Sequence, residues 1–145
     1  GGIREPFVAR WPGVVKPGTQ NEYIGAFWDI LPTFGELAGA KVAGGIDGQS
    51  FVRALTEKRT QKAHDYLYWE FHEKGGCQAV RQGNWKAVRL KAGTRSQARI
   101  ELYDLSTDPS ERNDLALRYP GKVKELGALM DEAHRPSVLF PFGNE

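Results

Sequence analysis

Cys77, the only cysteine of this 145-residue chain, lies four residues before Arg81 in the stretch GGCQAVR. A cysteine attacks as its thiolate, and a neighbouring guanidinium lowers the pKa of a thiol, so this spacing could hold an activated nucleophile. The alternative is an inert thiol packed on a strand, because an unpaired cysteine behaves as a small apolar residue. The Gly75-Gly76 pair predicts a tight turn that leads into such a strand.

A second group of candidate residues precedes that turn. Apolar and polar side chains alternate over residues 66–72, which predicts a strand with Glu70 and His72 on one face. The other face carries Leu67, Trp69 and Phe71. An imidazole at this position could hydrogen-bond a sugar hydroxyl or a sulfate group, and it changes charge near neutral pH. The alternative is a histidine on the solvent side of a half-buried sheet, which is also the prediction for His64 and His134.

The sequence has one strong charge asymmetry, an acid-free stretch between Glu73 and Glu101. Its cations are Lys74, Arg81, Lys86, Arg89, Lys91, Arg95 and Arg99. Converging cations would bind a polyanion, but Lys86 and Arg89 fall on opposite faces of a strand predicted over 85–90. We therefore favour a solvated hairpin, with Arg81 as the best candidate for a ligand contact.

Composition narrows the class of protein. The chain is 40% hydrophobic and 26% charged with a net charge of +2, which predicts a globular protein and neither a disordered chain nor a nucleic-acid binder. No apolar run approaches the roughly 20 residues that span a bilayer, so we expect no membrane segment. A single cysteine excludes an internal disulfide and a multi-cysteine metal site.

The first part of the chain predicts a buried strand over 3–10, a helix over 29–38 and a short helix after Phe51. Pro32 is tolerated in the first turn of the longer helix, and Gly39 can end it. The polar run 56–62 is the best candidate boundary.

After this boundary the pattern alternates. It predicts the strand 66–72, a hairpin of 78–81 and 85–90 around Gln82-Gly83-Asn84, and a strand over 100–105. A helix follows from Pro120, with an apolar stripe at helical spacing. The stripe is Val123, Leu126, Leu129, Met130 and Ala133. These elements predict a small α+β unit, an antiparallel sheet packed by a C-terminal helix.

Six blocks follow one another in an order that resembles the C-terminal third of the sulfatase family, which includes the type I arylsulfatases and glycosaminoglycan sulfatases. The blocks are GGIREPFVARWPGVVKPG from Gly1, WDILPTFGELAG from Trp28, DGQSF from Asp47, YLYWEF from Tyr66, AVRQGNWKAVR from Ala79, and ELYDLSTDPSERNDLA from Glu101. The resemblance covers nearly the whole chain. The first block is its most specific part.

The resemblance implies an α/β, alkaline-phosphatase-like sulfatase fold. Residues 1–62 would end its catalytic domain, and 63–145 would form its C-terminal subdomain. Sulfatases hydrolyse sulfate esters through a formylglycine, made from the first residue of a Cys/Ser-x-Pro-x-Arg motif, and through a calcium ion. In family order those residues precede Gly1, so we expect no catalytic residue and no metal ligand in this chain. Ala79 stands where that motif needs proline, which argues against Cys77 as a formylglycine precursor.

The resemblance also implies the partners. The C-terminal sheet of these enzymes borders the substrate pocket, so His72, Glu70 and Arg81 are the predicted contacts to a sulfated small molecule or glycan. The other partner would be the rest of the catalytic domain, with no nucleic acid and no membrane involved. The family suggests a periplasmic or extracellular location. The alternative function is a non-catalytic module that binds a carbohydrate or polyanion.

Overall fold

The computed structural model describes residues 2–56 and 60–142, and the chain separates into two compact units. The N-terminal unit is Gly2–His64, and the C-terminal unit comprises the rest of the chain from Asp65 onward. Part of the polar run 56–62, residues 57–59, lies outside the described residues. The assignment of residues 1–62 and 63–145 to two domains of a larger enzyme stays a prediction.

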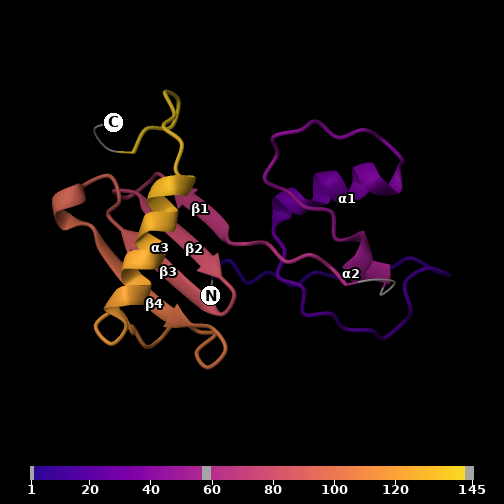
Figure 1. The fold of residues 1–145 in the computed structure, drawn as a ribbon, viewed down its shortest axis with the longest axis horizontal. Coiled ribbons are helices and arrows are strands. Elements are labelled where there is room, and N and C mark those ends of the chain that lie inside the picture. Colours follow the sequence, from indigo (N-terminus) through magenta and orange to yellow (C-terminus); the bar gives the residue numbers. More distant parts are fainter. Residues whose placement is uncertain (1, 57–59, 143–145) are drawn as a thin grey trace. The chain divides into compact units, whose positions relative to one another are not determined.

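The C-terminal unit is a four-stranded antiparallel sheet with one helix across a face (Figure 1). Its strands, β1 (Leu67–Phe71), β2 (Cys77–Gln82), β3 (Trp85–Leu90) and β4 (Arg99–Asp104), are neighbours in chain order. The helix α3 (Pro120–Ala133) begins with proline in its first turn, where a missing N–H costs nothing. The predicted hairpin, final strand and helix are confirmed.

Glycines shape the connections of this sheet. Gly83 opens the two-residue turn between β2 and β3 with a φ of +57°, a conformation that tight hairpins need and that glycine adopts freely. The connection from β1 to β2 has positive φ at Gly75 and Gly76. A Cβ on Gly76 would lie 2.4 Å from Cε1 of Phe142, so only glycine fits under that ring.

The core of the C-terminal unit lies between the sheet and α3. Its fully buried residues are Val80, Ala87, Leu102, Leu126 and Met130. Leu126 and Met130 come from the predicted apolar stripe, and Val123 and Leu129 of the same stripe pack around them. The helix stays on the sheet because this apolar area leaves water, which stabilises by about 25 cal/mol for each Å² buried.

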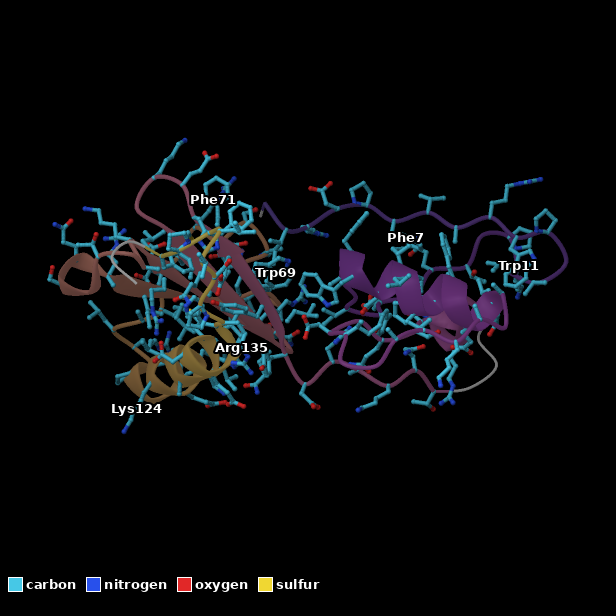
Figure 2. The ribbon with its side chains drawn as sticks, turned by 90° about the horizontal axis from the view of Figure 1, so that it is seen from above. Phe7, Trp11, Trp69, Phe71, Lys124 and Arg135 are labelled. Atoms are coloured by element: carbon cyan, nitrogen blue, oxygen red, sulfur yellow. The ribbon has the colours of Figure 1, made fainter. Side chains whose placement is uncertain are left out.

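The two faces of β1 differ from the prediction in one respect. Glu70 shares its face with Tyr68, and Tyr68 packs on the core under α3, so this face is covered by the helix and does not face solvent. Trp69 and Phe71 lie on the side of β1 away from α3 (Figure 2). Both faces of β1 carry large aromatic side chains, so alternation alone could not show which one the helix covers.

The N-terminal unit contains a 3₁₀ turn, η1 (Phe27–Asp29), and two short helices, α1 (Ile30–Leu37) and α2 (Val52–Thr56). Pro32 lies in the first turn of α1, and Gly39, with a φ of +63°, follows its C-terminus as predicted. Three apolar side chains of α1 are nevertheless exposed: Leu31, Phe34 and Leu37. The side of α1 that is buried in this unit carries Thr33.

The predicted buried strand over residues 3–10 does not form. The segment has no strand assignment, and Phe7 and Val8 are 62% and 90% exposed. A strand needs a hydrogen-bonded neighbour, and within the described residues the only sheet is the one in the C-terminal unit.

Among the residues that the structure describes, no helix is both long and apolar enough to cross a membrane.

Candidate functional site

The carboxylate of Glu70 is the centre of a polar network between β1 and the end of α3. Its Oε1 accepts hydrogen bonds from the hydroxyl of Tyr68 and from Nδ1 of His134, the latter at 2.5 Å. Its Oε2 lies 3.2 Å from Nε2 of His72. A carboxylate only accepts hydrogen bonds, so Nδ1 of His134 carries a hydrogen. The predicted proximity of Glu70 and His72 is confirmed.

The network continues across the sheet to a cation. Arg89 on β3 donates to Oε1 of Gln78 on β2 at 2.7 Å, and Nε2 of Gln78 donates to the hydroxyl oxygen of Tyr68 at 2.7 Å. Tyr68 then donates to Glu70. Every bond points from the guanidinium toward the carboxylate, and hydrogen bonds aligned in this way polarise and strengthen one another.

This environment shifts two pKa values in opposite directions. Burial raises the pKa of Tyr68, and the hydrogen bond to the negative Glu70 raises it further, so Tyr68 stays a donor. Burial alone would raise the pKa of Glu70, but hydrogen bonds from Tyr68 and His134 and the positive charges of His134 and His72 outweigh it and lower that pKa. Glu70 is therefore an anion at neutral pH, and it serves as an acceptor.

His72 connects this network to the C-terminal segment. Its ring stacks on Phe142 with centroids 4.3 Å apart, and Phe142 also meets His134 edge-on. The side chain of His72 is half-buried, which leaves part of the ring accessible. His134 was expected to be a surface residue, which is wrong: its side chain is 15% exposed and lies on Glu70. Its partner is 64 residues away in sequence, too far for a local pattern to reveal.

Arg81 does not join this network. It pairs in register with Leu67 at the other end of β1, and it lies on the sheet face opposite to Val80 and the helix. Its Nε donates to the carbonyl oxygen of Gly83 at 3.0 Å. The structure thus brings Glu70 and His72 together and places Arg81 elsewhere.

Two cations of the basic stretch between Glu73 and Glu101, Lys86 and Arg89, do not converge on one surface. Lys86 and Arg89 lie on opposite faces of β3, as predicted, and each pairs with an acid from outside the stretch. Lys86 binds Glu111, and Arg89 binds Asp131 at 2.7 Å. These pairings favour the hairpin interpretation over a polyanion surface, but the expectation of a solvated hairpin is wrong at these two positions, since the side chains of Lys86 and Arg89 are only 6% and 16% exposed.

Sequence reasoning missed a second polar cluster, in the N-terminal unit. Asp29 is completely buried and accepts hydrogen bonds from the backbone N–H groups of Ala26 and Gln49 at 2.9 and 2.8 Å. Nε2 of His64 lies 2.9 Å from Oδ2 of Asp29, and the side chain of His64 is only 7% exposed. The expectation of a surface histidine is therefore wrong for His64 as well.

The same cluster includes two further side chains. Nδ1 of His64 lies 2.9 Å from the side-chain amide of Gln49, so each ring nitrogen has a partner. Tyr23 lies beside the His64 ring, and burial, together with the negative charge of Asp29, raises the pKa of its phenol to about 12. With both members of the Asp29 and His64 pair hidden from solvent, the cluster supports structure and offers no access to substrate.

Cys77 begins β2 after the glycine turn, as predicted. Burial is the main cause that raises the pKa of its thiol above the ordinary value, so the thiolate is scarce at neutral pH. Cys77 pairs with Phe71 at one end of the β1 and β2 ladder, whereas Arg81 pairs with Leu67 at the other end. The guanidinium is therefore not an activating neighbour. In the part of the chain that the structure describes, no three His, Cys, Asp or Glu side chains gather as metal ligands.

Comparison with solved structures places the fold among alkaline-phosphatase-like sulfatases. A 2-O GAG sulfatase matches over 72% of this chain and 23% of its own, with 31% identity and a TM-score of 0.61. A protein solved in complex with its substrate D-glucosamine-2-N,6-O-disulfate matches over 86% of this chain and 26% of its own, with 25% identity and a TM-score of 0.70.

The family model for N-sulphoglucosamine sulphohydrolase, C-terminal, matches residues 1–133. The chain belongs to this sulfatase family. It is also 30% identical to an ulvan-active sulfatase from Formosa agariphila, over 79% of this chain and 29% of that protein. The chain thus spans less than a third of the length of the relatives it matches.

Proposed function

We propose that this chain is the C-terminal portion of a sulfatase whose full-length form hydrolyses sulfate esters of carbohydrates in the periplasm or outside the cell. The observation that carries the proposal is the family match over residues 1–133. A related protein was solved with a disulfated glucosamine as its substrate, which supports a sulfated sugar as the substrate class.

In this proposal, residues outside the chain provide the chemistry. The formylglycine and the calcium ion would supply the nucleophile and the positive charge that stabilises the sulfate oxygens. The described residues of this chain do not fit such a metal site, because no group of three acidic, histidine or cysteine side chains gathers among them. Their part is to shape and support the substrate pocket.

Two exposed apolar surfaces of the N-terminal unit indicate that another part of the full-length protein packs on it. Phe7 and Val8 extend from the unpaired segment 3–10, and Leu31 and Phe34 extend from α1. Contiguous exposed apolar side chains mark surfaces that another part of a protein covers. We propose that the rest of the catalytic domain covers both, with segment 3–10 adding a strand to its sheet.

The first prediction concerns the chain alone. Purified residues 1–145 should not hydrolyse p-nitrophenyl sulfate, with or without added calcium, because burial raises the pKa of the Cys77 thiol and the nearby charge of Lys86 does not offset it. Release of p-nitrophenol is the measurement. Reproducible turnover that disappears in Cys77→Ala would contradict the proposal and make Cys77 the nucleophile.

The second prediction concerns His72 in the full-length sulfatase. We expect His72→Gln to lower kcat/KM for a sulfated oligosaccharide about tenfold and to leave p-nitrophenyl sulfate within about twofold, because the contact of the glycan with the exposed part of the imidazole ring is lost. The exposed Lys124 on α3 provides the control Lys124→Gln, which should change neither value (Figure 2).

The two substrates separate recognition from folding. An equal loss on both would show that His72 acts through its stacking on Phe142, and no loss would remove it from the site. Arg81→Gln tests the other predicted contact in the same assay. Two findings together would instead favour the carbohydrate-binding module. The 145-residue chain alone would bind sulfated oligosaccharide, and the full reading frame upstream of it would lack a Cys/Ser-x-Pro-x-Arg motif.

A further inference from the structure

A half-open cleft of about 420 Å³ lies in the C-terminal unit, between the end of α3 and the strands β2 and β3. Its lining is Gln78, Arg89, Ala92, Ala98, Asp131, His134 and Phe142. The volume falls in the range of small-ligand sites and exceeds that of a single ordered water many times. Glu70, His72 and Arg81 do not line it, but it shares Gln78, Arg89, His134 and Phe142 with the network around Glu70.

The polar groups at this cleft are held rigidly. Arg89 donates through Nη1 to Gln78 and Asp131, both at 2.7 Å, and through Nη2 to the backbone carbonyl of Gly127 at 3.2 Å. Gly127 lets α3 lie close to the sheet at this point, because a Cβ at its position would lie only 3.1 Å from Cδ1 of Ile100. A fixed guanidinium loses little entropy when it binds a ligand.

Arg89 and Asp131 retain hydrogen-bonding capacity at the cleft. A guanidinium has five N–H donors, and within the described residues Arg89 uses three of them. Asp131 is 70% exposed and binds Arg89 through Oδ1. Its Oδ2 can therefore accept a bond from a ligand beside the remaining N–H donors. The two side chains together offer donors and an acceptor at neighbouring points.

This combination selects one class of ligand. Sulfate and phosphate groups only accept hydrogen bonds, so the carboxylate of Asp131 would repel them. An ammonium only donates, and Arg89 would repel it. A hydroxyl both donates and accepts, and neighbouring hydroxyls on a sugar ring can engage Arg89 and Asp131 together, while Ala92 and Ala98 meet its C–H groups.

We propose that this cleft binds one uncharged glycosyl unit through neighbouring hydroxyls held between Arg89 and Asp131. The site would hold a stretch of the carbohydrate chain away from the sulfate ester that is cleaved. Its link to hydrolysis rests on the proposed function, but the binding itself belongs to this chain and needs no turnover.

The test is a titration of the 145-residue chain with uncharged methyl glycosides of glucose, galactose and rhamnose, followed by NMR. We expect at least one of them to shift the signals of cleft residues, with a Kd of about 1–10 mM. Asp131→Asn should weaken binding about tenfold, because its one remaining oxygen pairs with Arg89 and the ligand then meets an NH₂ donor in place of an acceptor. The matched control Glu132→Gln removes one charge from the next, exposed residue of α3 and should leave the Kd unchanged.

A second variant keeps the proposal testable if the first changes the fold. Ala98→Leu fills the cleft without removing a polar group, and it should abolish binding while Asp131 and Arg89 stay in place. No shift of cleft signals with any of the three glycosides up to about 50 mM would overturn the proposal. Sodium sulfate that shifts the same signals more strongly would overturn it too, in favour of an anion site. Neither result would change the outcomes expected in the sulfatase assays above, so the cleft proposal and the proposed function can fail separately.

Discussion

Asp29→Ala is expected to destabilise the N-terminal unit by about 3–5 kcal/mol, because it leaves buried donors without an acceptor. The carboxylate accepts from Ala26, Gln49 and His64, and it is completely buried. Alanine provides no acceptor, and water cannot replace one in a site with no exposure. Urea unfolding at neutral pH measures the loss in variants whose Trp11, Trp69 and Trp85 are replaced by Phe, so that the fluorescence reports Trp28 on η1.

Two further variants define the cause. Asp29→Asn keeps one acceptor oxygen but turns an NH₂ group toward the donors, so an intermediate loss of about 1–3 kcal/mol is expected. Asp47→Ala removes an exposed carboxylate from the same unit and should change the free energy of unfolding by less than about 0.5 kcal/mol. The structural role of Asp29 would be falsified if Asp29→Ala and Asp47→Ala unfolded at the same urea concentration.

The Asp29 cluster explains two of the sequence blocks that resemble sulfatases. WDILPTF supplies Asp29 and Thr33, and DGQSF supplies the backbone N–H groups of Gln49 and Phe51 that they accept from. Gly48 of the second block lies so close to the first that a Cβ would be 2.2 Å from the carbonyl oxygen of Trp28. These blocks hold two loops together, so their resemblance reports the fold and not the catalytic chemistry.

Local patterns predicted the elements whose partners are close in sequence. The helix α3 follows from an apolar stripe that meets its own sheet, and the hairpin of β2 and β3 follows from Gly83 in a two-residue turn. The segment 3–10 has the same apolar character, yet it has no strand assignment, and Phe7 and Val8 are exposed. A strand is stable only with a partner, and that information lies outside its own residues.

The candidate site was predicted only in part, because some of its partners are distant in sequence. Alternation placed Glu70 and His72 on one face, and they do meet. It could not reveal that His134 completes the site, or that His64 pairs with Asp29 35 residues earlier. A histidine looks the same in a sequence whether it is exposed or bound to a buried carboxylate, because the partner is brought to it by the tertiary fold.

The other large effect is expected at Lys86 and Glu111, which form an ion pair on the sheet face away from α3. Nζ of Lys86 donates to both oxygens of Glu111 at 2.8 and 2.7 Å, and the side chains are 6% and 13% exposed. Glu111→Ala should lower the free energy of unfolding by about 3–5 kcal/mol, because it strands a buried ammonium. Urea unfolding at pH 7 measures it.

The double variant Lys86→Met with Glu111→Ala removes the stranded charge and should recover at least about 2 kcal/mol of that loss, since methionine fills a similar volume. The exposed pair of Lys122 and Glu125 on α3 is the control, and Glu125→Ala should cost less than about 0.5 kcal/mol. A double variant as unstable as Glu111→Ala alone would show that the loss comes from packing and not from the unpaired charge.

Acid titration gives an independent measure of the same pair. Burial alone would raise the pKa of Glu111, but the hydrogen bonds and charge of Lys86 act against burial, and the pKa lies below its ordinary value. A group whose pKa is lower in the folded state stabilises it above the unfolded pKa, and the contribution disappears as the pH falls through the folded value. The parent chain should therefore lose stability below about pH 4.5 more steeply than Glu111→Ala. Parallel slopes in urea midpoint against pH would mean that the ion pair does not link folding to protonation.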